Sequence, residues 1–558
     1  MTMKIKVIKT IIFSALVLIL SGCNEFLDIN ADPNNPTDPD YALILTDAQL
    51  HMSQALSYGS GGLTSLLGVY THQTVTRESF DAYGIAGADF EIETPWRSLY
   101  AGSLENLEDM ILKSLAEEEG DETLDYSIYR GIAKILKAYI YSQMVDVWGD
   151  IPFSEALNST EFRFPVYDND ESIYPQLHAM LDDGIADLQS ANPSSQQNPG
   201  INDLIYGGDL DSWIIAANSI KLKLYTQVRL VQDVSGDIAT TLNAGVFESV
   251  DDDFELQYGI TNTPENRYPG FLVDYAGNQI TQYVSPWFYE TMMGMTNEFH
   301  QNNPFANIRD PRVPYYFINQ LQEGDDSENP TEYRHEDAEW GSFITIHFGS
   351  ISTDRDHANR SSSSMLGIYA VGGKYNDAAF DGRVDADDAT GACPQRFLTY
   401  KDILFLKTEL AQLGIISDDP KVLLEAAMEA AFEKVDDVVI KVGSTQTIPE
   451  LSGSDVVVAY IEAVLAVYDE ADADKKMEII MTQKWISSIG SAVDQYSDYR
   501  RTGFPVMFDP ATDGDPLTET SRSYPLSMPW SANDLTLNAN APDQKLISTS
   551  GVFWNNNN

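Results

Sequence analysis

Apolar residues recur at steps of three and four positions through the first and last parts of the chain, which is the spacing of an amphipathic helix. One such run includes Ile128, Ile132 and Ile135, continues to residue 147 and stops at Gly149. Similar runs predict helices over residues 41–52, 170–188, 211–228, 403–413, 421–435, 456–468 and 475–489, with Asp170 and Asp211 as two of the N-caps. Antiparallel pairs of these helices would form a helical-hairpin scaffold, so we expect a mostly α-helical fold.

Residues 236–400 have a different pattern. This stretch is rich in aromatic residues and is punctuated by Pro, Gly and Asn, which predicts loops, short helices and a few short strands. We expect one strand over residues 343–348, and the run Tyr315-Tyr316-Phe317 indicates a second, buried one. The middle of the chain is therefore predicted to be an irregular insert in the helical scaffold.

The N-terminus has the layout of an export signal. Lys4, Lys6 and Lys9 precede an apolar run over residues 11–20, which is shorter than the roughly 20 residues that a membrane-spanning helix needs. The next residues, Ser21-Gly22-Cys23 after Leu20, resemble the lipobox of bacterial lipoproteins. This resemblance implies that residues 1–22 are removed and that Cys23 is acylated, although an ordinary secreted protein with a chance cysteine is the alternative. Residues 23–40, with three prolines among Asp and Asn, are expected to form a tether.

Composition narrows the classes of partner. The 558 residues include 85 acidic and 34 basic side chains, for a formal net charge of −51. Such a surface repels phosphate backbones, which argues against nucleic acid as a partner, but it leaves room for divalent cations. Besides Cys23 the chain contains one cysteine, Cys393, so we expect no disulfide.

Three strings of residues point to one family. They are GDIPFSEA at 149–156, YGGD at 206–209 followed by Trp213, and TQKW at 482–485 followed by DYRRTGFP at 498–505. On these strings the chain resembles the SusD/RagB family of outer-membrane lipoproteins. The resemblance implies one domain over residues 41–558, with about four tetratricopeptide-like helix pairs as scaffold and an irregular half that carries the ligand site. In the last string, Asp498 beside Arg500 and Arg501 predicts a bidentate ion pair that locks a loop against the helical half, with an anion site as the alternative.

The resemblance also implies a function. Members of this family are binding proteins that cap a SusC-like TonB-dependent transporter of the outer membrane and deliver glycans, or sometimes peptides, from the cell exterior. The residues give no competing enzymatic signal, because the chain lacks the HExxH and GxSxG spacings and has too many acids to single out a catalytic pair. We therefore expect an oligosaccharide-binding lipoprotein that is not an enzyme and needs no cofactor. A binder of peptides or other oligomers, and a structural accessory without a ligand, remain as alternatives.

A glycan site needs exposed aromatic platforms with polar groups at their rims, because sugars present hydroxyls around flat apolar faces. Aromatic residues in loops are better candidates than those at helical spacing. The predicted ligand-binding residues are Arg77, Phe80, Tyr83, Trp96, Trp287, Tyr289 and Trp340. Trp96 is ambiguous, since with Leu99 and Tyr100 it also fits the start of a packed helix, and the loop aromatics also fit a role as hydrophobic plugs.

One acidic stretch resembles a calcium loop. Asp377, Asp381, Asp385 and Asp388 occupy positions 1, 5, 9 and 12 of a twelve-residue pattern that binds calcium. Ala379 at position 3 and the Asp in place of Glu at position 12 depart from that pattern. A structural calcium ion is therefore one prediction, and a solvated acidic loop is its alternative.

Overall fold

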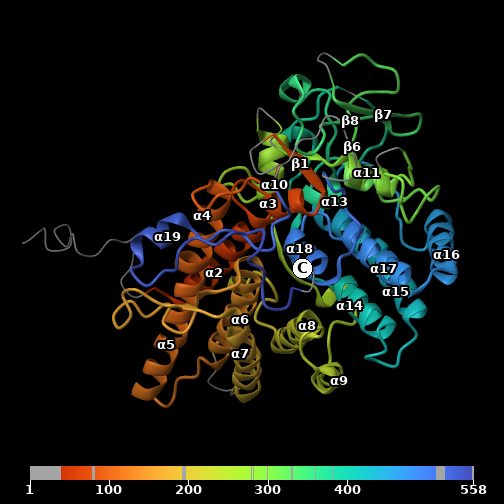
Figure 1. Cartoon of the computed structure of the whole chain (residues 1–558). Helices are drawn as coiled ribbons and strands as arrows, with labels where there is room; N and C mark the ends of the chain where they lie inside the picture. The colour runs from red at the N-terminus through yellow and green to blue at the C-terminus, as the bar shows by residue number, and fades with distance from the viewer. Residues whose placement is uncertain are drawn as a thin grey trace, which may run out of the picture.

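Helices dominate the first part of the chain in the computed structural model, which describes residues 39–77, 82–191, 197–277, 280, 282–297, 300–327, 331–357, 360–380, 382–510 and 522–555 (Figure 1). These helices are α2 (Tyr41–Leu56), α3 (Leu63–Tyr70), α4 (Phe90–Arg97), α5 (Glu105–Gly120), α6 (Ser127–Trp148), α7 (Asp170–Ser190) and α8 (Leu210–Val228). A π-helical segment, Ser98–Leu104, joins α4 to α5. The helices predicted from apolar spacing in this part are confirmed.

Helices α6 and α7 contact each other more extensively than any other two described elements. A side-chain carbon at Gly131 of α6 would lie 2.9 Å from the carbonyl oxygen of Gly184, and one at Gly184 would lie 3.0 Å from the carbonyl oxygen of Gly131. Because both positions are glycine, the two backbones can approach without a clash. Helix α6 is buried around nearly its whole circumference, since α5, α8 and α18 (Ala492–Thr502) also pack on it.

The last part of the chain supplies a second set of helices. These are α14 (Tyr400–Gln412), α15 (Pro420–Val442), α16 (Asp455–Glu470), α17 (Ala473–Ser487), α18 and the short α19 (Ala532–Leu537). Helix α14 packs against α15 and α17 and also contacts α8, so α8 joins the two helical sets, as Figure 1 shows. The predicted mostly helical fold is thus confirmed.

Short elements make up the irregular insert. Its strands form two-stranded antiparallel sheets: β4 (Phe254–Gln257) with β10 (Pro394–Leu398), β6 (Phe317–Ile318) with β9 (Met365–Leu366), and β7 (Tyr333–Asp337) with β8 (Gly341–Thr345). Its strand β5 (Gln282–Val284) pairs with β1 (Thr74–Thr76), which comes from the first part of the chain. A further small pair, β2 (Ile151–Pro152) and β3 (Tyr167–Asp168), follows α6. The short helices are α9 (Ser235–Ala244), α10 (Pro269–Phe271), α11 (Pro286–Met292), α12 (Val313–Tyr316) and α13 (Ile368–Val371). In Figure 1, β6, β7, β8 and α11 gather at one end of the molecule, above the helical scaffold.

The structure corrects several local predictions. Asp170 and Asp211 both lie in the first turns of their helices and are not N-caps. Asn169 is the N-cap of α7, and Asp209 is the N-cap of α8, where its side chain accepts a hydrogen bond from the backbone N–H of Ser212. The run Tyr315-Tyr316-Phe317 is buried as predicted, but its two tyrosines close helix α12 and only Phe317 begins a strand. The predicted strand over residues 343–348 corresponds to β8, which begins two residues earlier and ends at Thr345.

The pairing predicted for the last family string is present in part: Arg501 contacts Asp498, but its bidentate partner is Glu409, and Asp498 and Arg501 lie in a helix and not in a loop. On α18 the guanidinium of Arg501 binds both carboxylate oxygens of Glu409 on α14, and its Nη2 lies 2.7 Å from Asp498. Lys484 on α17 and Arg229 complete the network. All these charges are buried, so the network joins α14, α17 and α18 and leaves no open anion site.

The predicted signal peptide, Cys23 and nearly all of the tether lie outside the described residues. The described chain begins at Pro39, and Asp40 is the N-cap of α2, where its carboxylate accepts the backbone N–H of Ala42. In the described part of the chain, none of the helices is both long and apolar enough to cross a membrane.

Candidate functional site

A pocket of about 290 Å³ lies between α11, the β7–β8 hairpin and the segment that follows β8, all in the irregular insert, and is completed by His72 and Phe508 from outside the insert. This volume is near the lower end of the range for small-molecule sites, about 300–1,000 Å³. The lining residues are mainly aromatic or imidazole side chains: His72, Ser285, Pro286, Trp287, Glu290, Met295, Asn297, Tyr333, Arg334, His335, His347, Phe348 and Phe508. The pocket thus combines flat apolar surfaces with a few polar groups.

Trp287 is the largest aromatic ring of the pocket and stands in the first turn of α11, directly after Pro286. Its indole stacks on the imidazole of His300, with ring centroids 3.6 Å apart and planes inclined by 10°. Phe508 contacts the same indole at 5.8 Å in a tilted arrangement. The Trp287 side chain is only partly buried. It therefore presents a supported, partly exposed platform to the pocket.

Glu290, one turn further along α11, connects three segments around the pocket. Its Oε1 accepts hydrogen bonds from Asn297 Nδ2 at 2.7 Å and from the Tyr333 hydroxyl at 2.8 Å. Its Oε2 lies 3.2 Å from His300 Nδ1. An ionised carboxylate only accepts hydrogen bonds, and this buried one is satisfied by three donors. Glu290 therefore fixes Asn297 and Tyr333 at the rim and His300 behind Trp287.

Two of the lining histidines are held by tyrosines behind the wall of the pocket. His72 Nε2 lies 3.0 Å from the hydroxyl of Tyr83, and His335 Nδ1 lies 2.9 Å from the hydroxyl of Tyr289. Burial lowers the pKa of His72 to about 3, and burial also lowers the pKa of His335 from its usual value. These two imidazoles are therefore uncharged at neutral pH.

Of the predicted ligand-binding residues, Trp287 lines the pocket directly. Tyr83 and Tyr289 were predicted as exposed platforms, and this exposure is wrong for both, since they are 5% and 1% exposed. The Tyr83 ring packs against Phe348, with centroids 5.1 Å apart, and the Tyr289 ring stacks on Phe343 at 3.7 Å. Irregular segments need hydrophobic plugs, and both rings fill that role. They support the pocket from behind.

The remaining predicted residues lie elsewhere. Trp96 is packed in α4, with ring centroid 5.2 Å from that of Trp148, so the packed-helix interpretation holds and exposure is wrong. Trp340 is partly buried at the turn of the β7–β8 hairpin and does not line the pocket. The guanidinium of Arg77 lies 5.9 Å from the ring centre of Tyr283, also outside the pocket lining. Phe80 lies outside the described residues.

The prediction from sequence missed most of the pocket. Glu290, Tyr333, His347, Phe348 and Phe508 were not singled out, and they come from segments far apart in the chain. The histidines are one feature of the sequence that relates to this pocket. The chain has seven histidines, and four of them either line this pocket or stack on Trp287. Their sequence spacing matches no known motif, so only the fold reveals the cluster.

The acidic stretch predicted to bind calcium is engaged with protein groups. Asp377 accepts from Gln446 Nε2 at 2.9 Å, and Asp385 lies 3.1 Å from both Arg360 and Arg383. Asp388 accepts the backbone N–H of Asp385 in a capping box, and Asp381 lies outside the described residues. Calcium at this loop stays a prediction, and its binding would have to displace the two arginines.

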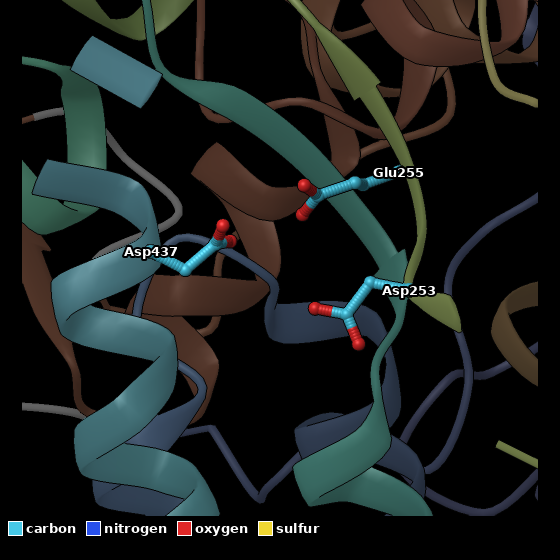
Figure 2. A group of neighbouring side chains, drawn as sticks. All are labelled: Asp253, Glu255 and Asp437. Atoms are coloured by element: carbon cyan, nitrogen blue, oxygen red, sulfur yellow. The ribbon is translucent and has the colours of Figure 1, made fainter. Parts of the chain in front are cut away.

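Three other acidic side chains lie closer together than those of the predicted calcium loop. Figure 2 shows the carboxylates of Asp253, Glu255 and Asp437 pointing toward a common centre. Asp253 directly precedes β4, Glu255 lies on β4 and Asp437 lies on α15. The Nζ atom of Lys434 lies 2.7 Å from all three, and Lys441 adds a second ammonium group 2.8 Å from Asp437. The protein's own lysines supply the positive charge here, so the cluster ties α15 to β4 and is not a vacant metal centre.

Comparison with known protein families matches most of the chain to one family model. The family model for SusD-like proteins, described as "Starch-binding associating with outer membrane", matches residues 33–525. A search of curated proteins gives no significant match.

Solved structures share the fold at low sequence identity. A chitin-binding protein superposes with a TM-score of 0.65 at 20% identity, covering 92% of this chain and 100% of that chain. A SusD/RagB family protein from Bacteroides thetaiotaomicron gives 0.63 at 21% identity, over 93% and 99% of the two chains. A SusD homolog from Bacteroides fragilis gives 0.63 at 16% identity, over 93% and 99%. At these identities the likeness shows the fold alone.

Proposed function

Because the chain belongs to the SusD-like family, we propose that it is a cell-surface lipoprotein that captures an oligosaccharide at the Trp287 pocket. In this proposal Cys23 carries the lipid anchor in the outer membrane, and the bound glycan passes to a SusC-like TonB-dependent transporter. Capture must be followed by release into the transporter, so binding is expected to be modest and spread over several contacts.

The observation that carries the proposal is the supported, partly exposed indole of Trp287 beside a polar rim. A sugar ring can stack its apolar face on the indole, whose position is fixed from behind by His300. Hydroxyl groups at the edge of the sugar would then meet Asn297 and Tyr333, which Glu290 holds in place. The pocket offers the two kinds of contact that sugar recognition requires.

The same lining supports binding without hydrolysis. Glycoside hydrolysis uses two carboxyl groups, about 5 to 9.5 Å apart, on the two sides of the bond to be cleaved. Among the described residues that line the pocket, Glu290 carries the one carboxylate, and its oxygens already accept hydrogen bonds from three side chains. It is not placed to act as a free acid or nucleophile.

The test is a comparison of two tryptophan variants in the soluble protein that begins after Cys23. A glycan array identifies ligands for the unchanged protein, and affinity electrophoresis then measures retention of Trp287→Ala and Trp340→Ala. The first variant should lose at least about tenfold in affinity, or about 1.4 kcal/mol. The second is the matched control, because it removes a partly buried tryptophan of the same insert outside the pocket.

Three outcomes separate the alternatives. Equal retention of both variants would contradict the assignment of the pocket. Binding to a peptide array but to no glycan would favour the peptide-binding alternative. Failure to bind any glycan or peptide, while the protein still associates with the transporter, would favour a structural accessory.

A further inference from the structure

We infer that the Trp287 pocket selects an uncharged sugar unit and rejects a unit that bears a carboxylate or sulfate group. This inference rests on the proposed function and narrows its substrate class. It follows from the hydrogen-bond and charge partners of the side chains in and around the pocket.

Arg334 is the first of these side chains. It is the one arginine or lysine among the described residues that line the pocket, and an acidic sugar would need such a cation, because a guanidinium recognises a carboxylate through paired hydrogen bonds. Its guanidinium is turned to Glu336 on the same strand, with which it forms an ion pair. Its Nη2 also donates to the carbonyl of Asp325 at 2.6 Å and to Ser342 Oγ at 2.9 Å. The guanidinium of Arg334 is therefore engaged by groups of its own hairpin and by the backbone of Asp325.

Glu290 places a negative charge beside the pocket, which would repel an anionic ligand. Its carboxylate is 5% exposed and is satisfied by neutral donors, Asn297 and Tyr333, together with the His300 ring. No arginine or lysine pairs with it in the described structure. A ligand carboxylate stacked on Trp287 would lie near this negative charge, and like charges a few ångströms apart repel strongly where water is excluded. The pocket therefore penalises an anion more than it penalises a hydroxyl.

Two other arginines of the insert have partners within the protein. Arg309 lies 3.2 Å from both Asp337 and Glu339, and Arg355 donates to the backbone carbonyls of Ser350 and Arg77. The lining imidazoles of His72 and His335 are uncharged at neutral pH, as described above. Arg309 is therefore paired with two acids, and the two terminal nitrogens of Arg355 are held by backbone carbonyls.

The overall charge of −51 adds a long-range repulsion of polyanionic glycans, but salt screens it. The Debye length is about 10 Å at 0.1 M ionic strength and about 3 Å at 1 M. A preference that comes from the lining of the pocket should survive at high salt, and a preference that comes only from the distant surface should not. This difference makes the two sources separable by experiment.

The experiment uses matched pairs of glycans and the soluble protein that begins after Cys23. The probes are hexasaccharides of β-1,4-glucose, α-1,4-glucose and β-1,4-mannose, each paired with its counterpart oxidised at C6 to a uronate. Affinities are measured at pH 8, where an ordinary histidine with a pKa of about 6.5 is uncharged, and at about 0.1 M and about 1 M NaCl. For each neutral glycan that binds, the uronate should bind at least about tenfold more weakly at both salt concentrations.

A gain of binding tests the role of the Arg334–Glu336 pair. In Glu336→Gln the guanidinium loses its partner charge, so binding of the uronate should strengthen at least about threefold while the neutral glycan is unaffected. Glu339→Gln is the matched control, since it removes the same charge from the same hairpin but pairs with Arg309, outside the pocket. Its ratio of neutral to uronate binding should stay that of the unchanged protein.

The results that overturn the inference are equally specific. A uronate that binds as tightly as its neutral counterpart, or more tightly, contradicts selection for an uncharged unit. A preference that disappears at about 1 M NaCl, or an equal gain in both glutamate variants, assigns selectivity to the general surface charge and not to the pocket. If neither member of any pair binds, and the glycan array is also empty, it is the proposed function that fails.

Discussion

The imidazole of His300 lies parallel to the indole of Trp287, with ring centroids 3.6 Å apart, and its Nδ1 lies 3.2 Å from Glu290. His300 is 2% exposed, so it is a buried support and not a ligand contact. An aromatic pair of this kind contributes about 0.5–1.5 kcal/mol beyond its burial. The orientation of the binding platform therefore depends on a side chain that the ligand does not touch.

His300→Gln should lower glycan affinity by roughly threefold to tenfold, because the amide can still bond to Glu290 but no longer stacks on Trp287. His300→Phe keeps a ring at that position and should stay closer to the unchanged protein. Isothermal titration calorimetry with a glycan from the array measures both. Equal affinities for the two variants would show that the stacking does not position Trp287.

Glu290→Gln should destabilise the protein and weaken binding together. A glutamine side chain has one oxygen, whereas Glu290 accepts from Asn297, Tyr333 and His300 at two oxygens. Leaving a buried donor without an acceptor costs about 1–3 kcal/mol, which urea denaturation can measure as a lower free energy of unfolding. Glu339→Gln, at an exposed acid of the β7–β8 turn, should leave both quantities unchanged. A Glu290 variant with unaltered stability would contradict the connecting role.

The scaffold could be predicted from sequence because its helices are long and periodic. Ile128, Ile132 and Ile135 repeat at helical spacing, and Gly149 follows the end of α6. Helix α18 was missed because it is short and polar, and its buried surface includes Arg500 and Arg501, whose charges are neutralised or hydrogen-bonded only in the folded chain. Burial of such residues cannot be inferred from an apolar pattern.

The site could be predicted only in part for a related reason. Trp287 and Tyr289 are two residues apart in one short helix, yet Trp287 faces the pocket and Tyr289 stacks on Phe343 behind it. In a region of short elements, no repeated spacing shows which ring points outward. The partners that decide this, His300 and Phe343, come from other segments.

The buried network around Glu409 predicts a loss of stability in acid. Burial alone would raise the pKa of Glu409, but Arg229 and Arg501 lower it to about 2, from 4.5 for an ordinary glutamate. A depressed pKa means that the stabilisation is complete above about pH 4.5 and is lost as the pH falls toward 2. The free energy of unfolding should therefore fall by about 3 kcal/mol across this window through this group.

Comparison with Glu409→Gln isolates that contribution from the other carboxylates. The variant should be less stable at pH 7 by about 3–5 kcal/mol, because buried Arg229 loses its partner charge and buried Arg501 keeps only Asp498. Between pH 4.5 and 2 its stability should fall less steeply than that of the unchanged protein. Urea denaturation at a series of pH values measures both slopes, and parallel slopes would contradict the lowered pKa.

Lys434→Met should convert the acidic cluster of Figure 2 into a site that responds to divalent cations. The substitution removes the ammonium group 2.7 Å from Asp253, Glu255 and Asp437, so stability should fall by about 3–5 kcal/mol. Calcium prefers clustered carboxylate oxygens and should restore part of the loss, seen as a rise in melting temperature of the variant alone. Lys421→Met, at an exposed ion pair, is the control and should show neither effect. A variant that loses stability without responding to calcium would contradict this reading of the cluster.

Cys23→Ala should release the protein from the membrane without weakening glycan binding. Trp287 and the other lining residues lie far along the chain from Cys23, so loss of the lipid should leave the pocket unchanged. Lasting attachment to the membrane, in contrast, requires more than one acyl chain on the protein. Fractionation of cells, followed by an alkaline carbonate wash that removes proteins held only by partners, measures the anchored share. Cys393→Ala is the matched control, because Cys393 is buried in the core and cannot accept a lipid there, so this variant should stay in the washed membranes. Retention of Cys23→Ala after the wash would mean that something other than acylation of Cys23 holds the protein at the membrane.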